Sequence, residues 1–343
     1  MNRGDRQLNH EDYCQYLLSC QGNYTLTHYA EHVEGISHDA VNRYMAKAQL
    51  RPSYLWEQVK EHIVPSDQGF VVFDDTVLDK RYSRAIDPVR SQYSGNAHGI
   101  IRGIGVVTCI YVNPESGQFW AIDWRIFDPD RDGKSKLDHV EAMLKHLHQY
   151  KKLPYRAVLM DGWYASKNLM LLIEQELEKI FYCPLKTNRL VDDSRKAQPY
   201  RPVGQLLWSV DEQKEGKTIK IKDYPKDHKV RLFRVPVSTD RTDFIATNDK
   251  TCHSSDAARS VCAVRWKIEQ LHREIKQTCG IERCQCRLNR IQRNHIACAF
   301  LVWNRLKNLA YDTSQNVYQI KQNLLKSYLV NELKSPTISF VPA

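Results

Sequence analysis

The spacing of hydrophobic and polar positions changes twice along the chain. Residues 1–64 carry short apolar stretches at helical spacing with little β-branched alternation, which predicts helices. After the turn-rich segment 65–69, short apolar runs and alternating stretches predict strands. A helical pattern resumes at Ser254 and continues to about Tyr311, with a break near Gly280. The chain is therefore predicted to be an α/β protein with helical regions at both ends.

Two short N-terminal helices are separated by a glycine turn. The helical segments 26–33 and 37–45 flank Gly35, and Ser37 is placed to cap the second helix. A helix-turn-helix DNA-binding module needs this arrangement, so residues 1–64 are predicted to form such a domain. A plain helical hairpin packed on the core is the alternative. The side chains that would face a DNA groove are Ser37, His38, Asn42 and Arg43.

Between residues 70 and 183 the predicted order is three strands, helix, strand, helix, strand. The strands are expected at 70–73, 105–112, 119–126, 155–160 and 180–183, and the helices at about 137–149 and 166–179. This is the order of a ribonuclease H-like α/β core. Alternating stretches within a charged, proline-containing segment predict a β-rich insertion after that core. The predicted domains are a helical domain at 1–64, a catalytic core at 70–183 and 251–311, the insertion at 184–250, and a C-terminal helix and tail at 312–343.

Composition supports an ordinary globular protein. The chain has 343 residues, of which 42% are hydrophobic and 26% charged. No apolar run approaches the roughly 20 residues that span a bilayer, and the N-terminus has no apolar core of a secretion signal. We therefore expect no membrane association and a cytoplasmic location. The ten cysteines are scattered, and the spacing within Cys279, Cys284 and Cys286 matches no common zinc motif, so reduced thiols are expected, with zinc as the alternative.

The net charge is concentrated at one end of the chain. It is +10 overall, and the pI is near 9.0, which indicates a polyanionic partner. Residues 251–343 contain 14 Lys and Arg against 6 Asp and Glu, a net +8 and nearly the whole excess. A charge that only served solubility would be spread along the chain. Its concentration predicts contact with nucleic acid.

Two acids follow apolar runs that are predicted to be strands of one sheet. Asp74 comes directly after the run 70–73, and Asp161 directly after the run 157–160. Neighbouring strands would hold these carboxylates a few ångströms apart, where they repel each other unless a cation lies between them. Oxygen-only ligands favour Mg²⁺ or Mn²⁺. The pair therefore suggests a metal site, and a third acid is needed to decide.

The third acid is predicted on a helix over residues 261–277. At helical spacing Arg265, Glu269 and Lys276 share one stripe with His272, beside an apolar stripe that would anchor the helix. Glu269 would then project from the edge of the buried face. Helix geometry alone favours an ordinary salt-bridged face over a catalytic one.

The residues around Glu269 resemble a known signature. The pattern Cys262-x2-Arg265-x3-Glu269-x6-Lys276 resembles the Tyr-x2-Arg-x3-Glu-x6-Lys signature of bacterial insertion-sequence DDE transposases. The run Arg-Trp-Lys-Ile-Glu that ends at Glu269 looks like the core of that signature. The closest branch is the seven-hundred-one type, within the insertion-sequence four superfamily.

Two further blocks match the same family in the same order. The string Asp-Asp-Thr at 74–76 resembles the family's Asp-x-Thr/Ser block, and Asp-Gly-Trp-Tyr at 161–164 resembles its second Asp block. Asp74, Asp161 and Glu269 are spaced by 87 and 108 residues, and the match covers about residues 70–310. The string at 74–76 favours Asp74 over Asp75, because the family's acid stands two positions before Thr.

The resemblance implies a DNA transposase with a ribonuclease H-like core and a β-rich insertion. Such an enzyme cleaves the ends of its element and joins the freed 3′-hydroxyls to target DNA. It implies two Mg²⁺ ions, with Mn²⁺ able to substitute, held by Asp74, Asp161 and Glu269. Arg265 and Lys276 would position phosphates. The expected partners are double-stranded DNA, as terminal inverted repeats and target, and a second copy of the chain in the synaptic complex.

Two departures from the family pattern affect what is implied. Cys262 stands where the signature has Tyr, which puts in doubt any hydroxyl contact to DNA there. Relatives that use a hairpin intermediate stack a flipped base on a Trp of the insertion, and the matching position here is Asp243. The sequence therefore gives no support for a hairpin route. Trp163 or Trp208 could replace the stacking residue, although a core role is expected for each.

Four arginines follow the predicted catalytic helix. Their spacings of four, three and three would place them on one helix face with only Glu282 nearby, which predicts phosphate contacts. They are Arg283, Arg287, Arg290 and Arg293. Two other functions remain open from the sequence: a catalytically inactive, sequence-specific DNA-binding protein, and a ribonuclease H-like nuclease without strand transfer.

Overall fold

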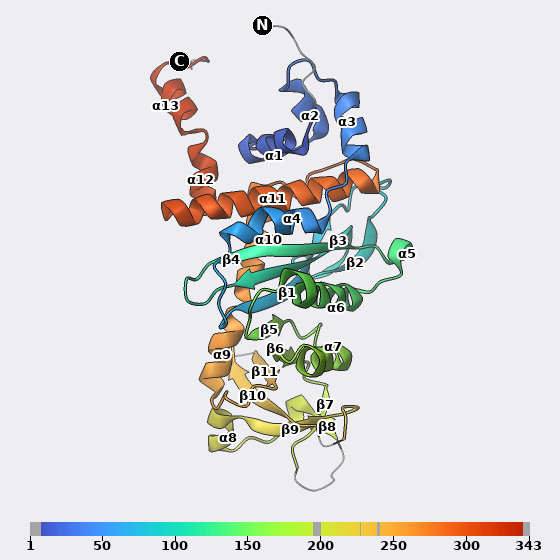
Figure 1. Ribbon diagram of the computed structural model, residues 1–343, viewed down its shortest axis with the longest axis vertical. Helices are drawn as coiled ribbons and strands as arrows, with labels where there is room; N and C mark the ends of the chain where they lie inside the picture. Colours follow the sequence, from blue (N-terminus) through green and yellow to red (C-terminus); the bar gives the residue numbers. More distant parts are fainter. Residues whose placement is uncertain (1–7, 195–199, 227, 239–240, 339–343) are drawn as a thin grey trace, which may run out of the picture. The chain divides into compact units, whose positions relative to one another are not determined.

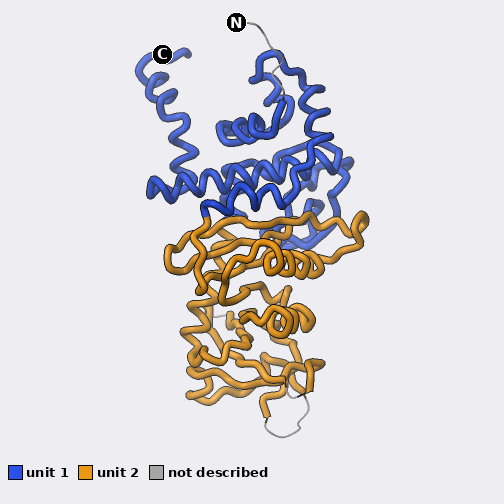
Figure 2. The backbone as a smooth tube through the Cα atoms, viewed as in Figure 1, with its two compact units in different colours: residues 1–62, 76–105, 271–343 blue, residues 63–75, 106–270 orange. Residues whose placement is uncertain are grey.

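The computed structural model describes residues 8–194, 200–226, 228–238 and 241–338, and these form a mixed α/β protein. The last five residues of the predicted C-terminal tail lie outside this description. The chain divides into two compact units (Figure 2). Unit 1 comprises residues 1–62, 76–105 and 271–343, and unit 2 comprises 63–75 and 106–270. Among the described residues, no helix has the length and apolar content that crossing a bilayer requires.

Unit 2 is built on a long mixed sheet (Figure 1). Its strands join in the order β4-β3-β1-β5-β6-β11-β10-β9-β7-β8. Their bounds are β1 Phe70–Asp79, β3 Gly99–Val112, β4 Phe119–Phe127, β5 Ala157–Met160, β6 Ile180–Leu185, β7 Leu190–Asp192, β8 Arg201–Pro202, β9 Lys217–Ile221, β10 Val230–Pro236 and β11 Thr242–Thr247. Strands β1, β5 and β6 are parallel, whereas β6–β11, β11–β10 and β10–β9 pair antiparallel.

The burial of the central strands explains their place in the sheet. All four residues of β5 and the first four residues of β1 are buried. A strand with uniformly apolar, buried residues has both faces covered, as parallel strands in α/β proteins do. The connection from β4 to β5 is α6 (Lys136–His146) with a π-helical turn at Leu147–Lys151. From β5 to β6 it is α7 (Lys167–Leu171) with a π-helical turn at Leu172–Glu176. Each helix was predicted and is confirmed in position.

Unit 2 also contains further short helical segments. They are α8 (Val210–Glu215), the short turns α5 (Pro129–Asp132) and η4 (Val203–Gln205), and α9 (Ser255–Ala263), with the first turn of α10 (Trp266–Thr278). The predicted β-rich content of residues 184–250 is confirmed by β9, β10 and β11, which lie close to the alternating stretches of the sequence.

Unit 1 is mainly helical. Its helices are α1 His10–Ser19, α2 Leu26–Glu31, α3 His38–Lys47, α4 Pro52–Val59, the short turn η1 Lys60–His62, α11 Asn289–Thr313, α12 Val317–Asn323 and α13 Lys326–Lys334, together with most of α10. It also holds β2 (Arg90–Ser94), which pairs antiparallel with the first residues of β3.

The N-terminal helices pack on α11. The Tyr13 hydroxyl donates to Nδ1 of buried His295 at 2.8 Å. The Asn294 side-chain amide donates to the carbonyls of Met45 and Ala48 at 2.7 and 2.8 Å, which closes the end of α3. These polar contacts are formed with little solvent access, so each leaves a costly unpaired group if it is broken. The N-terminal helices therefore share the core of unit 1 with α11.

Three predicted elements differ from the structure. The first strand was expected to end at Phe73, but β1 continues to Asp79. The helical pattern from Ser254 has the predicted break near Gly280, where residues 279–288 are not helical, but Val264 and Arg265 form a further turn that was not predicted and that divides α9 from α10. The single helix expected at about 316–334 is two helices, α12 and α13. All ten cysteines are free thiols.

Candidate active site

Asp74 and Asp161 occupy matching positions on two adjacent parallel strands of unit 2. The last paired residues of β1 and β5 are Phe73 and Met160, and each acid follows directly. Asp161 ends its strand as predicted, whereas Asp74 lies inside β1, which corrects the expectation of a strand tip. The side chain of Asp74 is only 16% exposed. The shared register places both acids at one edge of the β1–β5 pair.

The environment of Asp74 disfavours a lone negative charge. Burial, followed by the neighbouring carboxylate of Asp75, raises the pKa of Asp74 to about 8, and Asp161 contributes in the same direction. The backbone N–H of Asp75, which donates to Asp74 Oδ1 at 2.8 Å, and the guanidinium of Arg265 act the other way. A cation beside Asp74 would therefore stabilise its ionised form.

Glu269 lies on the first turn of α10 and is joined to Asp74 through Arg265. The Arg265 guanidinium is 2.9 Å from Glu269 Oε1 and 3.9 Å from Asp74 Oδ2. The turn at Val264 and Arg265, where one continuous helix was predicted, separates α9 from α10. Arg265 is thus a cationic link between two of the predicted catalytic carboxylates.

Arg241 lies close enough to both Asp161 and Glu269 to interact with their charges. The carboxylate of Asp243, to which Arg241 is bonded, raises the pKa of this guanidinium, and the charges of Asp161 and Glu269 raise it further. The charges of Asp74 and Asp161 therefore act on each other, and Glu269 shares Arg265 with Asp74 and Arg241 with Asp161. Within the described residues, no three His, Cys, Asp or Glu side chains are already gathered as a metal site.

A second acid beside Asp74 has its own partners, which the sequence did not reveal. The Asp75 carboxylate accepts a hydrogen bond from Lys136 Nζ at 2.5 Å and one from the buried Tyr164 hydroxyl at 2.7 Å. Lys136 is the first residue of α6, and its ammonium also lies 5.7 Å from the centre of the Trp163 ring. Asp75 is therefore held by a lysine 61 residues away and a tyrosine 89 residues away, separations that no local pattern encodes.

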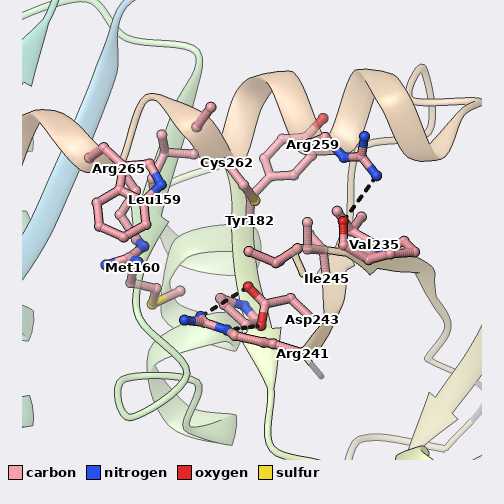
Figure 3. Close-up of a pocket in the computed structure, with 15 residues that line it drawn as sticks. Leu159, Met160, Tyr182, Val235, Arg241, Asp243, Ile245, Arg259, Cys262 and Arg265 are labelled. Atoms are coloured by element: carbon pink, nitrogen blue, oxygen red, sulfur yellow. Dashed lines mark hydrogen bonds and ion pairs between the residues drawn. The ribbon is translucent and has the colours of Figure 1, made fainter. Parts of the chain in front are cut away.

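An apolar pocket of about 240 Å³ lies beside these carboxylates in unit 2 (Figure 3). Met160 and Arg265, which border the candidate catalytic acids, are among its lining residues. Asp243, the position where hairpin-forming relatives have Trp, forms two bonds with Arg241 at 3.0 and 3.1 Å on the pocket wall. The pocket is also lined by Leu159, Tyr182, Pro184, Val235, Pro236, Val237, Ile245, Arg259, Cys262, Ala263 and Trp266.

The pocket clarifies the two departures from the family pattern. Cys262 lines the pocket, and burial raises the pKa of its thiol to about 12, so it is a neutral, weakly polar wall residue. Trp266 also lines the pocket and is 54% exposed, and the sequence did not predict this exposed position. Of the two tryptophans considered as stacking residues, Trp163 is 49% exposed, which corrects the expected core role, while Trp208 packs on Phe244.

Lys276 has a different environment from the other signature residues. In unit 1 its ammonium donates to the carbonyl of Val77 at 2.9 Å and lies 3.6 Å from a carboxylate oxygen of Glu282. These contacts hold the side chain, which is 14% exposed, against the end of β1. A phosphate contact by Lys276 remains a prediction.

The segment predicted as a helix-turn-helix contains α2, a turn at Gly35 and α3, and its DNA-binding role stays a prediction. Gly35 takes a left-handed backbone conformation (φ 74°), and the Ser37 hydroxyl accepts a hydrogen bond from the Ala40 N–H as the N-cap of α3. The Asn42 amide bonds to the carbonyl and ring of His38 one turn earlier. Arg43 is exposed. Ser37 and Asn42 are therefore already engaged within α3, and the His38 ring shares the contact with Asn42, which leaves Arg43 as the more available side chain.

The four predicted arginines do not form one helical face. Arg283 and Arg287 lie in the non-helical segment before α11, and only Arg290 and Arg293 are helical. The physical reason is that the carbonyls of Glu282 and Cys284 accept hydrogen bonds from buried Lys80 at 2.6 and 2.5 Å, so they do not serve a helix. Arg283, Arg287 and Arg290 are exposed, whereas Arg293 bonds to Asn289 at 2.8 Å.

Arg287 lines a pocket together with residues of α3, the predicted recognition helix. A pocket of about 290 Å³ in unit 1 is lined by Arg43 of α3 and by Arg287. Its other lining residues are Asn42, Ala46, Cys286, Leu288 and Ile291. Arg43 and Arg287 come from two separate predictions, lie 244 positions apart in the chain, and border one pocket.

The chain is similar to known proteins at the levels of family and structure. The family model of the transposase DDE domain matches residues 66–305. No curated protein matches the chain. A piggyBac transposase synaptic complex with hairpin DNA is similar in structure, with 14% sequence identity over 98% of this chain and 70% of that chain, and a TM-score of 0.49.

Endonuclease V structures are similar at a lower level. The Ciona intestinalis enzyme, in complex with a 24mer DNA that contains an inosine followed by a ribo-adenosine, has 11% identity over 66% of this chain and 96% of that chain, with a TM-score of 0.31. The catalytic domain of human endonuclease V has 10% identity over 66% of this chain and 95% of that chain, with a TM-score of 0.30.

Proposed function

The chain belongs to the transposase DDE domain family, and from this premise we propose that it cleaves the ends of an insertion sequence and joins the 3′-hydroxyls to target DNA. The observation that carries the proposal is the arrangement of three acids. Asp74 and Asp161 follow the last paired residues of two parallel strands, and Arg265 links Asp74 to Glu269. These acids are the proposed catalytic residues.

We propose a ribonuclease H-like catalytic core. The succession of β1, β3, β4, α6, β5, α7 and β6 along the chain supports it, because three strands, helix, strand, helix, strand is the order expected from the sequence, and β1, β5 and β6 are parallel. The strands β7 to β11 then correspond to the insertion between Asp161 and Glu269. The same alignment of blocks supports membership of the insertion-sequence four superfamily, with Arg265, Glu269 and Lys276 at the signature spacing.

The donor set fits divalent cations. Asp74, Asp161 and Glu269 offer only oxygen ligands, which suit Mg²⁺ or Mn²⁺, and burial of Asp74 beside other carboxylates favours a compensating cation. Asp74 would contribute to two ions, and Asp161 and Glu269 to one each. When bound, two such ions lower the pKa of an attacking water and stabilise the leaving 3′ oxygen.

The protein's own residues prepare this site. Arg265 holds Glu269 and offsets the charge near Asp74, so it can instead contact a DNA phosphate once cations occupy the carboxylates. Lys136 and Tyr164 donate hydrogen bonds to the Asp75 carboxylate. Within the part of the chain that the structure describes, no side chain donates a hydrogen bond to Asp74, which is therefore the more available acid of the two. The same site can serve cleavage and joining, since the freed 3′-hydroxyl takes the place of water as the nucleophile.

The proposed partners are double-stranded DNA and a second copy of the chain. Two element ends must be joined in concert, and a symmetric dimer is the usual solution. End recognition is proposed for His38 and Arg43 of α3, and phosphate contact for the exposed arginines Arg283, Arg287 and Arg290. The Arg241–Asp243 pair stands where a stacking Trp would be, so no hairpin intermediate is proposed. The enzyme is expected to act in the bacterial cytoplasm.

A plasmid assay separates this function from the alternatives. The purified full chain is incubated with Mg²⁺ and a plasmid that carries the DNA flanking its gene, and nicks are mapped. Metal-dependent nicks at the element ends are expected, and binding without nicks would indicate a DNA-binding protein without catalysis. A pre-cut end is then offered with a second plasmid. Joined products are expected, and cleavage without joining would indicate a nuclease.

A further inference from the structure

A short β-hairpin in unit 1 carries an exposed face that the proposed function has not yet used. The hairpin arm, as we name residues 90–103, consists of β2 and the start of β3 joined by the turn 95–98 (Figure 1). Its register pairs Ser91 with Arg102 and Tyr93 with Ile100. Because side chains alternate between the faces of a strand, these four residues share one face.

The exposed face carries an unusual apolar pair. Tyr93 is 64% exposed and Ile100 is 75% exposed, and they lie directly opposite each other next to the turn. A single exposed apolar residue is ordinary, but two large ones that face each other across a strand pair are typical of an interaction surface. The opposite face is less exposed, since Ser94 is buried and Gln92 and Ile101 are half-buried.

The charge of the arm indicates the chemistry of the partner. No Asp or Glu occurs from Pro88 to Pro114, although the chain has 40 acids in 343 residues and a stretch of that length would hold about three. The same stretch contains Arg90, Arg102 and His98. Arg102 is exposed on the face of the apolar pair, two residue pairs further from the turn. The surface is therefore cationic and apolar at once.

We propose that the hairpin arm is a DNA-contacting element, with Tyr93 and Ile100 against the bases of a groove and Arg102 on a backbone phosphate. A two-stranded ribbon fits a DNA groove, and exposed apolar side chains can press between base steps. A guanidinium two residue pairs away on the same face suits a phosphate at the groove edge. The inference rests on the proposed function in one respect, that the chain acts on duplex DNA.

The arm would add a contact distinct from those of α3 and the exposed arginines. The contribution of its apolar pair to the binding free energy depends little on salt. Arg102, by contrast, would release a counterion from one phosphate, so its contribution falls as the salt concentration rises. The two parts of the surface can therefore be separated by the salt dependence of binding. A hydrophobic protein partner, or a second copy seated on the arm, would show neither behaviour with DNA.

The test uses the full chain and a fluorescent 40-base-pair duplex from the DNA flanking its gene. Tyr93→Ala with Ile100→Ser should weaken binding about tenfold while leaving the slope of log affinity against log salt unchanged. Arg102→Gln should flatten that slope by about 0.9. Tyr150→Ala is the matched control, because Tyr150 is an exposed tyrosine (71%) of unit 2 outside the arm, and it should bind like the unchanged protein.

Both variants binding like the control would overturn the inference, and so would a changed oligomeric state in sedimentation with unchanged DNA affinity. Should the double variant fail to fold, Ile100→Ser alone and Arg102→Gln, both at exposed positions, decide the matter by the same readouts. Metal-dependent nicking is measured in parallel. If the unchanged protein nicks DNA and the arm variants bind DNA normally, only the inference about the arm is wrong. If the arm variants bind DNA more weakly but the unchanged protein does not nick DNA, only the proposed catalysis is wrong.

Discussion

Asp74 and Asp75 are adjacent in the chain, yet their carboxylates have different partners. Asp75 is held by Lys136 and Tyr164, while Asp74 faces Arg265 and the neighbourhood of Asp161. Alternation along β1 sends successive side chains to opposite faces, which explains why one acid can be structural and the other catalytic. The sequence-based preference for Asp74 is consistent with this division.

The first prediction separates the two acids by substitution. Asp74→Ala is expected to reduce DNA cleavage on the order of 10³-fold, since it removes a proposed metal ligand. Asp75→Asn and Lys136→Met are each expected to reduce it about tenfold, as changes to supporting residues do, and to raise the Mn²⁺ concentration for half-maximal activity. Initial cleavage rates across a Mn²⁺ titration give both values. An active Asp74→Ala with an inactive Asp75→Asn would reverse the assignment.

At the scale of elements, local patterns predicted what local forces determine. The buried run before Asp74, the hairpin of β3 and β4, and the cap at Ser37 all follow from spacing and residue type. Strand β2 was missed because its exposed edge residues, such as Ser91 and Tyr93, have no apolar alternation to detect. Its pairing with β3 decides its conformation.

The prediction that Arg283, Arg287, Arg290 and Arg293 share one helix face was wrong because of contacts with distant parts of the chain. Gly280 takes a left-handed conformation (φ 61°), and a Cβ at this position would collide with the ring of Tyr24. The following carbonyls are bound by Lys80, which lies some 200 residues earlier in the chain. Periodicity cannot anticipate such partners. The partners of Asp75 and the two-unit division escaped the sequence for the same reason.

The exposed arginines give a prediction about salt dependence. Arg283, Arg287 and Arg290 replaced together by Gln should flatten the slope of log affinity against log salt by about two to three units, since each phosphate contact contributes about 0.9. Arg293 is left unchanged because it is bonded to Asn289. Fluorescence anisotropy between 50 and 300 mM salt measures the slope. An unchanged slope with a lower melting temperature would show that these arginines are structural.

The role proposed for α3 in recognition is tested by point substitutions, because deleting residues 1–64 would remove helices that pack on α11. Arg43→Gln is expected to weaken binding to the element ends more than to unrelated DNA, since its side chain is exposed on α3. Ser37→Ala is the companion variant, expected to lower the free energy of unfolding by about 1 kcal/mol through the lost cap. Equal weakening for all DNA by Arg43→Gln would remove its role in recognition.

At the scale of the whole molecule, unit 1 buries two histidines in the neutral form. Burial lowers the pKa of His295 to about 4 and that of His272 to about 3. His295 uses both ring nitrogens, accepting from the Tyr13 hydroxyl and donating to the carbonyl of Gly280. The unfolded chain takes up a proton near pH 6.5, but the folded chain does not. Stability therefore falls as the pH decreases from about 6.5 towards 4.

This linkage predicts a measurable pH dependence. From pH 7.5 to pH 5 each histidine should cost about 2 kcal/mol of unfolding free energy, since one pKa unit corresponds to about 1.4 kcal/mol. His295→Gln should remove about that amount from the pH-dependent loss, while lowering stability at pH 7.5 through the broken hydrogen bonds. Urea unfolding at several pH values tests it. The same pH dependence in both proteins would mean that His295 is protonated in the folded state.

The central claim is that Asp74, Asp161 and Glu269 act together in metal-dependent DNA strand transfer. The most direct measurement offers a labelled, pre-cut duplex from the DNA flanking the gene to a supercoiled plasmid, with Mg²⁺ or Mn²⁺, and compares the unchanged chain with Asp161→Asn. Joined products from the unchanged chain, their absence with EDTA, and their loss in Asp161→Asn with DNA binding intact are the predicted result. Joined products at equal yield from Asp161→Asn, or in EDTA, would contradict the account.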